Sequence, residues 1–294
     1  MIHRHVSHNG RLLPIEQARL SPSQEALING WGLFTTLRVV DGQPFAFERH
    51  WRRLERDSER THVPLPTGSR ALLDDVLAVI RANQVKEGAV RVYIFWNRTG
   101  HWHGEEALPE SDLLITSAPM PAHHEPLRLD LREHGRHAAS PLAGVKTTSW
   151  LLNVWLAAEA KKGGFDEVIL LNERGEVAEC TSANVFAVRG GQALTPPLSS
   201  GCLAGITREV LLEIGPRAGV PVREAVLRPE DLYSADEVFV SSTIRAALAV
   251  GEIAGRTLAR GPGPVSRKLS EAFAAYMAEY IAQAKAAAGR QVSA

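Results

Sequence analysis

Cysteine is scarce in this sequence, and the two that occur, Cys180 and Cys202, are too few for a disulfide scaffold of 294 residues. Their spacing also matches no zinc-binding pattern. Histidines are more numerous, at 11, but "HRHVSH" and "HWH" lack the HExxH helix spacing of a zinc protease. We therefore expect loop or solvent-exposed histidines, no metal site and a reducing, cytoplasmic location.

An excess of charge of either sign is also absent, because Lys+Arg and Asp+Glu each number 33. A nucleic-acid-binding protein usually shows a basic excess, so this class of function is disfavoured. No run of 18 apolar residues is present, and the first residues, "MIHRHVSHNGRLLP", contain no apolar h-region. We therefore expect neither a membrane span nor a secretory signal.

The chain is long and apolar enough for one large or two modest domains, with 45% hydrophobic residues. Segments rich in β-branched residues are interspersed with segments of helical period, which predicts a mixed α/β fold. Residues 119–127, "PMPAHHEPL", are proline-rich and aperiodic, as in a linker. The sequence thus predicts an N-terminal domain at 1–118 and a larger C-terminal domain at 128–294.

Local patterns predict the main elements of both parts. "GLFTTLRVVDGQPFAF" predicts a hairpin around Asp41-Gly42, and "AVRVYIFWN", at 89–97, predicts a strand buried on both faces. In the C-terminal part, "DEVILLNERGEVAECTSANVFAVRGGQALTPP" predicts a β-meander. The sequence from residue 265 predicts a long amphipathic helix, and we expect its apolar stripe to belong to the core. The members of this stripe are Leu269, Phe273, Tyr276, Met277 and Tyr280.

A single lysine, Lys146, lies between a glycine-led turn and an apolar, helix-like run in "GVKTTSWLLNV". A lysine that acts as a nucleophile needs a desolvated site and an electron sink, and pyridoxal phosphate is the natural sink. Such a cofactor requires a carboxylate at its pyridine nitrogen and a cup for its phosphate. Glu179, in "EVAECTSANVF", is a candidate carboxylate, and the alternative is an edge-strand glutamate in water.

Two segments could form the phosphate cup. Gly205, Ile206 and Thr207 lie where a loop enters a predicted helix, and free N–H groups and the helix dipole favour an anion there. An ordinary N-cap threonine is the alternative interpretation of this segment. A second cluster of hydroxyls follows a predicted strand: Ser241, Ser242 and Thr243. Arg53 could add a bidentate contact, although an arginine on a helix face is commonly solvated.

The order of these residues resembles that of the fold-type IV pyridoxal-phosphate enzymes. This family includes branched-chain and D-amino-acid aminotransferases, (R)-amine transaminases and aminodeoxychorismate lyase. The most specific matches are "H-x-x-R-L" at 50–54, "E-x-x-x-x-N-x-F" at 179–186 and "G-I-T-R" at 205–208, and the resemblance spans nearly the whole chain. It implies two α/β domains with a D-amino-acid-aminotransferase-like architecture, pyridoxal 5'-phosphate as the cofactor, and a homodimer.

The resemblance also implies a role for each matching residue. Lys146 would form the Schiff base with the cofactor and carry the proton, and Glu179 would pair with the pyridine nitrogen. Arg53, Thr207 and Thr243, with the backbone N–H groups of Ile206 and Thr207, would hold the phosphate, and Asn184 would support this cup.

The residues expected to select the substrate match the motifs of different members of this family. Of the "Y-x-R" element of branched-chain aminotransferases, Tyr93 remains but Phe95 replaces the arginine. Arg98 and His101 could bind a substrate carboxylate, or could lie in an exposed loop. "F-T-T" and "E-C-x-x-A-N" resemble aminodeoxychorismate lyase. The candidates for lining the pocket are Phe34, Thr36, Arg38, Tyr93, Phe95 and Arg98.

We therefore predict an aminotransferase that moves an amino group between an amino acid or primary amine and a 2-keto acid. The alternative is aminodeoxychorismate lyase, which releases pyruvate and 4-aminobenzoate. The expected partners are these small molecules, with neither nucleic acid nor membrane among them.

Overall fold

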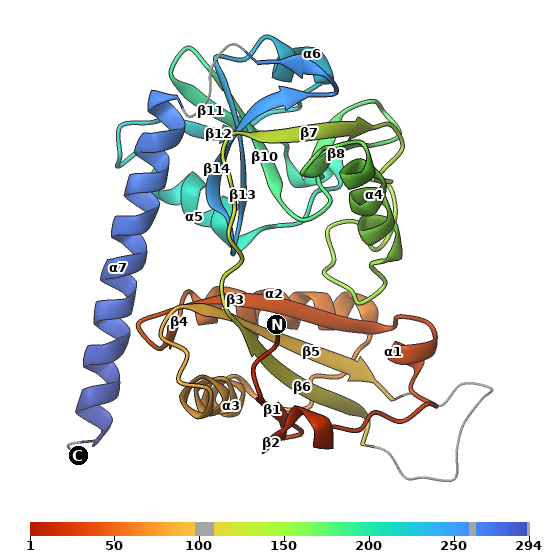
Figure 1. Ribbon diagram of the computed structural model, residues 1–294, viewed down its shortest axis with the longest axis vertical. Coiled ribbons are helices and arrows are strands. Elements are labelled where there is room, and N and C mark those ends of the chain that lie inside the picture. The colour runs from red at the N-terminus through yellow and green to blue at the C-terminus, as the bar shows by residue number, and fades with distance from the viewer. Residues whose placement is uncertain (98–108, 259–262, 293–294) are drawn as a thin grey trace. The chain divides into compact units, whose positions relative to one another are not determined.

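Two β-sheets organise the chain, and each belongs to its own unit of contacting residues (Figure 1). The computed structural model describes residues 1–97, 109–258 and 263–292. Helices accompany both sheets, so the predicted mixed α/β fold is confirmed. Unit 1 comprises Met1–Pro121, Val145–Trp150 and Met277–Ala294, and unit 2 comprises Ala122–Gly144 and Leu151–Tyr276.

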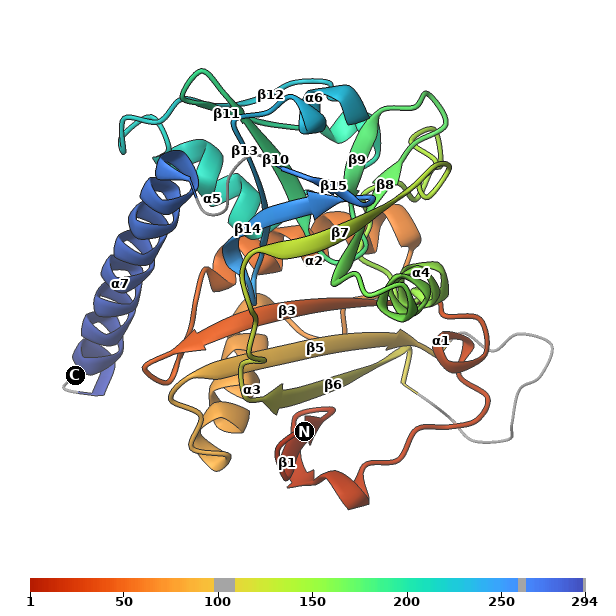
Figure 2. The ribbon, with the colours of Figure 1, turned by 45° about the horizontal axis from the view of Figure 1, so that its top comes forward.

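Unit 1 is built on a six-stranded antiparallel sheet with the order β2-β1-β6-β5-β3-β4. The strands are β1 (His5–His8), β2 (Arg11–Pro14), β3 (Gly32–Val40), β4 (Gln43–Pro44), β5 (Gly88–Trp96) and β6 (Ser111–Ala118). The long strands β3, β5 and β6 lie side by side (Figure 2). Asp41 and Gly42, with φ angles of 50° and 74°, connect β3 to β4, which confirms the predicted hairpin.

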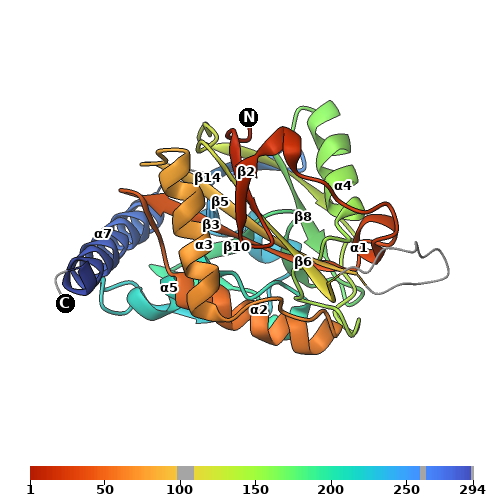
Figure 3. The same ribbon diagram turned by 90° about the horizontal axis from the view of Figure 1, so that it is seen from below.

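One face of this sheet is covered by the helices α2 (Phe47–Thr61) and α3 (Ser69–Ala82), while the short helix α1 (Glu25–Ile28) precedes β3 (Figure 3). Alternate residues of β5 face this core and are buried: Val90, Val92 and Ile94. Arg91, Tyr93 and Phe95 point to the opposite face and are only half-buried. The expected burial of both faces of β5 is therefore wrong for the second face, because successive side chains in a strand point apart.

Unit 2 is built on a nine-stranded mixed sheet with the order β12-β11-β10-β13-β14-β7-β8-β9, to which β15 adds by pairing with β14. The strands are β7 (Leu127–Arg132), β8 (Glu167–Leu171), β9 (Val177–Cys180), β10 (Asn184–Arg189), β11 (Gln192–Thr195), β12 (Val222–Glu224), β13 (Glu237–Ser242), β14 (Ala246–Ile253) and β15 (Arg256–Thr257). The helices of this unit are α4 (Leu151–Lys162), α5 (Ile206–Ile214) and α6 (Pro229–Tyr233). The predicted helices at α4 and α5 are confirmed.

Strands β8 to β11 do not form the predicted continuous meander. β8–β9 and β10–β11 are antiparallel pairs, but the sheet order places four strands between β9 and β10. The chain turns sharply after β9, where the Cys180 N–H donates to the Ala183 carbonyl at 2.7 Å. The hydroxyls of Thr181 and Ser182, inside this turn, both donate to Glu167. An alternating apolar pattern therefore predicts the strands correctly but not which of them pair.

Helix α7 (Pro264–Val292) confirms the predicted C-terminal helix. Leu269 and Phe273, from the predicted stripe, are buried within unit 2. Farther along, Tyr280 belongs to unit 1, where its hydroxyl accepts the Phe47 N–H at 3.2 Å and donates to Glu48 Oε2 at 2.6 Å. None of the helices in the described parts of the chain is both long and apolar enough to cross a membrane.

The predicted domains at 1–118 and 128–294 differ from the two units in one respect. They assign the segments Val145–Trp150 and Met277–Ala294 to the C-terminal domain, whereas both segments make their contacts within unit 1. The domain boundaries and the linker at 119–127 therefore stay a prediction.

Candidate active site

The backbone of Lys146 is fixed along β3 of unit 1. The Phe34 N–H donates to the Lys146 carbonyl at 3.1 Å, and the Thr148 N–H donates to the Gly32 carbonyl at 2.9 Å. The Lys146 N–H itself donates to Asp57 Oδ2, on α2, at 3.1 Å. The segment with Lys146 is thus held like a short additional strand beside β3, which defines where its side chain starts.

The side chain of Lys146 lies against aromatic rings. Its Nζ is 4.4 Å from the ring centroid of Phe34 and 5.3 Å from that of Trp150. The two rings meet edge to face, with centroids 5.4 Å apart. The chain has six lysines, and Lys146 is the only one that is not exposed. A partly desolvated ammonium over ring faces fits the setting that a nucleophilic lysine requires.

Helix α2 places a buried imidazole and a buried guanidinium around Thr35 of β3. Arg53 Nη2 donates to Thr35 Oγ1 at 2.7 Å, and the Thr35 hydroxyl lies 2.7 Å from His50 Nδ1. Burial, and then the charges of Arg53 and Lys146, hold the pKa of His50 well below its ordinary value. His50 is therefore a neutral hydrogen-bonding partner, and Arg53 is not the solvated helix-face arginine of the alternative interpretation.

The open face of the β3–β5 pair carries the predicted pocket residues of unit 1. Thr36 lies opposite Arg91 and Phe34 opposite Tyr93, with their rings stacked at 6.2 Å. Phe95 stacks on Tyr93 at 5.6 Å. The other predicted pocket residues are Arg38, half-buried on β3, and Arg98, which with His101 lies outside the described residues. Arg91 was not predicted, although its two-residue spacing from Tyr93 could have indicated that it shares the face.

Glu179 of unit 2 is buried, although β9 ends the sheet order. Arg136 Nε donates to its Oε1 at 2.8 Å, and the Leu203 N–H donates to its Oε2 at 3.1 Å. The solvated edge-strand alternative is therefore wrong. The expected partner for a buried carboxylate exists, but Arg136, which also donates to Asn153 Oδ1 at 3.2 Å, was missed from the sequence.

The loop that leads into α5 is tied to the neighbouring strand β10. Asn184 Nδ2 donates to the Leu203 carbonyl at 2.9 Å. Gly205 occupies the N-cap position of α5 and provides no side-chain cap, and a Cβ built there would overlap Asn184 Oδ1. Ile206 and Thr207, the first helical residues, are buried. An uncapped helix N-terminus of this kind is suited to bind an anion.

The hydroxyl cluster of unit 2 lies beside this loop. Ser241, at the end of β13, pairs directly with Asn184 in the sheet, and Thr243 follows two residues later. The hydroxyls of Ser241 and Ser242 are buried and have no hydrogen-bond partner among the described residues. Buried hydroxyls without partners are uncommon, and a phosphate would satisfy them. The residues present in unit 2 therefore fit the phosphate of the predicted cofactor.

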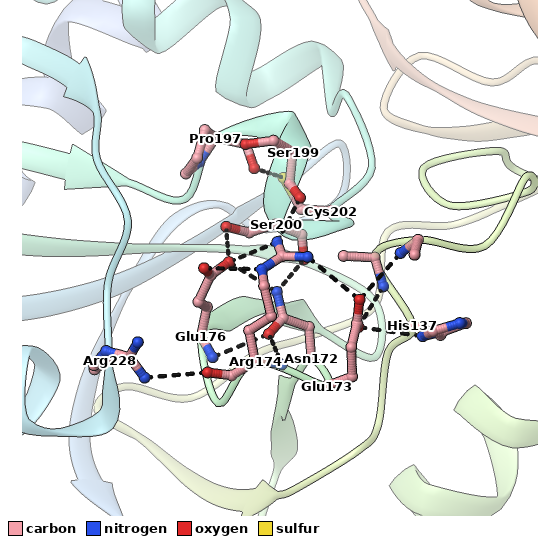
Figure 4. Close-up of polar contacts among 12 residues, drawn as sticks. His137, Asn172, Glu173, Arg174, Glu176, Pro197, Ser199, Ser200, Cys202 and Arg228 are labelled. Atoms are coloured by element: carbon pink, nitrogen blue, oxygen red, sulfur yellow. Dashed lines mark hydrogen bonds and ion pairs between the residues drawn. The ribbon is translucent and has the colours of Figure 1, made fainter.

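Figure 4 shows a dense polar network around the β8–β9 turn of unit 2. Glu173 accepts the N–H groups of Ala138, at 2.7 Å, and Ala139, at 3.2 Å, and chiefly the Ala138 bond lowers its pKa to about 2. The hydrogen bond from Arg174 likewise lowers the pKa of Glu176 to about 2. Because both carboxylates have internal partners, this network fixes the chain around the turn and offers no obvious ligand site.

Both cysteines are free and buried in unit 2. Desolvation raises the pKa of Cys180 well above its ordinary value and that of Cys202 to about 12. Neither thiol is therefore present as a thiolate nucleophile at neutral pH.

Comparison with known proteins gives a consistent family match. A family model described as amino-transferase class IV matches residues 32–253. D-alanine aminotransferase from Staphylococcus haemolyticus is 30% identical over 278 residues, which cover 92% of this chain and 96% of that protein.

Solved structures agree in fold over nearly the whole chain. The branched-chain aminotransferase from Thermoproteus uzoniensis with norvaline has a TM-score of 0.84 at 30% identity, covering 92% of this chain and 93% of that one. A second branched-chain amino acid aminotransferase, from the organism abbreviated T.th. and solved with pyridoxamine 5'-phosphate, has a TM-score of 0.83 at 26% identity, with the same coverage. The predicted α/β architecture is thereby confirmed.

Proposed function

Because the chain belongs to the class IV aminotransferases, which depend on pyridoxal 5'-phosphate, we propose that it transfers the amino group of an α-amino acid to a 2-keto acid with Lys146 as its nucleophile. The observation that carries this proposal is the environment of Lys146, the one lysine of six that is withdrawn from solvent and placed on aromatic rings. The cofactor supplies the electron sink that stabilises negative charge at the substrate Cα.

Lys146 has two tasks in this proposal. Its Nζ would hold the cofactor through a covalent bond and, as a free amine, would take the proton from the substrate Cα. The rings of Phe34 and Trp150 limit the access of water to Nζ and hold it by cation–π attraction. The hydrogen bond from its backbone to Asp57 fixes the segment from which the side chain extends.

The residues of unit 2 would hold the cofactor and tune it. Glu179 would accept a hydrogen bond from the protonated pyridine nitrogen, and the bond from Arg136 orients this carboxylate. The N–H groups of Ile206 and Thr207 would bind the phosphate. The hydroxyls of Ser241 and Ser242, with Thr243, offer further donors, and Asn184 supports the loop. Arg53 of unit 1 is proposed as a further phosphate ligand.

We propose an amino acid as the amino donor and leave its configuration to be determined by assay. The similar proteins include both a D-alanine aminotransferase and branched-chain aminotransferases, so D- and L-amino acids are both to be assayed. The lyase alternative predicts pyruvate release from aminodeoxychorismate without an amino acceptor. The 30% identity to a D-alanine aminotransferase and to a branched-chain aminotransferase favours transamination over this reaction.

We further propose that the protein is a homodimer in the cytoplasm. Helix α4 buries Leu156 and Ala160, yet Leu151, Val154 and Trp155 on its other sides are more than half exposed. Large apolar side chains on several sides of a helix are normally covered, and a second copy of the chain would provide that cover. The two free cysteines agree with a reducing compartment, which cell fractionation would test.

The test of Lys146 compares Lys146→Ala with Lys161→Ala, which changes an exposed lysine on α4. We expect the wild-type protein and the Lys161 variant to show the visible absorption band of lysine-bound cofactor and to transaminate. Lys146→Ala should lose the band and at least about 1000-fold in turnover, because it loses both nucleophile and base. A Lys146→Ala protein that retains the band would disprove the assignment, and a wild-type protein without it would disprove the function.

A further inference from the structure

Arg91 is a half-buried cation with no carboxylate partner among the residues that the structure describes. Its Nε donates to Thr36 Oγ1 at 3.1 Å, and its Nη1 lies 3.4 Å from the Tyr93 hydroxyl. Its guanidinium carbon lies 5.4 Å from the ring centroid of Phe34 and 5.9 Å from that of Tyr93. All of these partners are neutral.

Three other arginines that are withdrawn from solvent are arranged differently. Arg136, Arg208 and Arg245 have side chains that are 22%, 5% and 13% exposed, and each forms an ion pair. Their partners are Glu179, Glu224 and Glu167. Withdrawing a guanidinium from water without an anion is costly, and hydroxyls and ring faces offset only part of this cost. Arg91 therefore has the surroundings expected of an arginine whose counterion is part of a bound ligand.

The position of Arg91 indicates which ligand this is. Lys146 Nζ and the Arg91 guanidinium both lie over the Phe34 ring, at 4.4 Å and 5.4 Å from its centroid. The two cations are therefore no farther apart than the sum of these distances. A substrate whose Cα is within reach of Nζ carries its carboxylate on that same carbon, so Arg91 could serve as the counterion of this carboxylate.

We propose that Arg91 binds the α-carboxylate of the substrate and thereby restricts the enzyme to α-amino acids and 2-keto acids. This inference rests on the proposed transamination and gives Arg91 the role of selecting against amines that lack a carboxylate. Nη2 has no hydrogen-bond partner among the described residues, so at least one arm of the guanidinium fork is available. A carboxylate would accept from it at about 2.8 Å, as in other charge-assisted pairs.

The neighbouring side chains extend this assignment to the rest of the substrate. Phe34, Tyr93 and Phe95 stack in a row along the same face, with centroid distances of 6.2 Å and 5.6 Å. Phe34 and Tyr93 place aromatic area beside the guanidinium, which strengthens an ion pair by excluding water. The same wall favours substrates with apolar side chains over charged ones.

The experiment uses the holoenzyme and a pair of probes of the same size and shape, of which one is charged and the other neutral. 4-Methylpentanoate carries a carboxylate, and 4-methylpentanamide has the same skeleton without the charge. Binding of each is measured by titration of the cofactor spectrum in wild type, Arg91→Gln, Arg91→Lys and, as an exposed control on α3, Arg81→Gln.

We expect wild type and Arg81→Gln to bind the acid more tightly than the amide. Arg91→Gln should weaken binding of the acid and raise KM for amino acids by about 10- to 100-fold, as for loss of a charged hydrogen bond, with amide binding unchanged. Arg91→Lys should lie in between, because it keeps the charge without the fork.

Two results would overturn the proposal. One is a wild-type enzyme that binds the acid and the amide equally, which needs no variant and so does not depend on the folding of Arg91→Gln. The other is an Arg91→Gln enzyme that still prefers the acid as wild type does. Failure of the proposed function is a separate outcome, because there the wild-type protein transfers no amino group from any amino acid.

Discussion

At the scale of single residues, the ion pair between Glu179 and Arg136 links the electrostatics of unit 2 to the proposed cofactor site. Both side chains are largely buried, at 8% and 22% exposed, and they meet at 2.8 Å. Such a pair is costly to break from one side, because the remaining charge has no solvent to replace its partner. A substitution that breaks this pair is therefore expected to lower both the stability and the activity of the protein, and the two effects can be measured separately.

Glu179→Gln keeps the size of the side chain and removes its charge. We expect a loss of about 3 kcal/mol in the free energy of unfolding, because Arg136 keeps its charge without a counterion. The value of kcat/KM should fall at least about 10-fold, because the pyridine nitrogen loses a charged hydrogen bond. Urea unfolding and steady-state transamination measure the two effects separately.

Glu179→Asp is the matched control, because it retains the charge on a shorter side chain. It should recover most of the stability that Glu179→Gln loses. If Glu179→Gln transaminates at the wild-type rate, the role assigned to Glu179 at the cofactor is wrong, whatever happens to stability.

The sequence predicted some residues of the site and missed others, for a physical reason. Lys146 and Glu179 could be proposed because each belongs to a local motif in a fixed order along the chain. Arg136 lies 43 residues from Glu179 in the sequence, and Arg91 lies opposite Thr36 only because β5 pairs with β3. Such partnerships depend on strand pairing, which a local pattern does not specify.

At the scale of elements, the entrance to α5 depends on the absence of one side chain. Gly205 has an ordinary φ of −69°, so backbone strain does not explain the glycine. The ideal Cβ position overlaps Asn184 Oδ1, and Asn184 holds the Leu203 carbonyl. A methyl group there would displace the side chain that positions the loop.

Gly205→Ala should therefore weaken binding of pyridoxal phosphate by about 10-fold, the equivalent of one hydrogen bond that is lost from the cup. Titration of the apoenzyme with the cofactor, followed by absorbance, gives the dissociation constant. Gly68→Ala is the control, because Gly68 is the N-cap of α3 and a Cβ there meets nothing within 4 Å. Wild-type affinity in Gly205→Ala would show that the loop tolerates the displacement.

Element types were more predictable than their arrangement. The hairpin at Asp41-Gly42 and the helices at α5 and α7 follow from turn residues and helical period in the sequence. The pairing of β9 and β10 was predicted wrongly, because the hydroxyls of Thr181 and Ser182 turn the chain toward Glu167. This contact joins residues of distant elements and has no local signature.

At the scale of the whole molecule, the exposed apolar residues of α4 predict self-association. Trp155 is 55% exposed and Leu151 82% exposed, although both are large apolar side chains. Trp155→Glu should shift the sedimentation coefficient from that of a dimer toward that of a single chain, because a charge would have to be buried. Val226→Glu, which changes another half-exposed residue of unit 2, should leave the dimer intact. A wild-type protein that sediments as a monomer would contradict the proposed homodimer.

The discontinuity of unit 1 has a consequence for biosynthesis. Its sheet is complete by residue 118, but the segment Val145–Trp150 and the end of α7 join it only later in the chain. Lys285 pairs with Asp41 at 3.0 Å, and Tyr280 packs on Phe45 at 5.3 Å between ring centroids. While the ribosome is still adding α7, the first unit therefore lacks contacts from its last segment. The nascent protein can acquire its full unit 1 only after α7 has been synthesised.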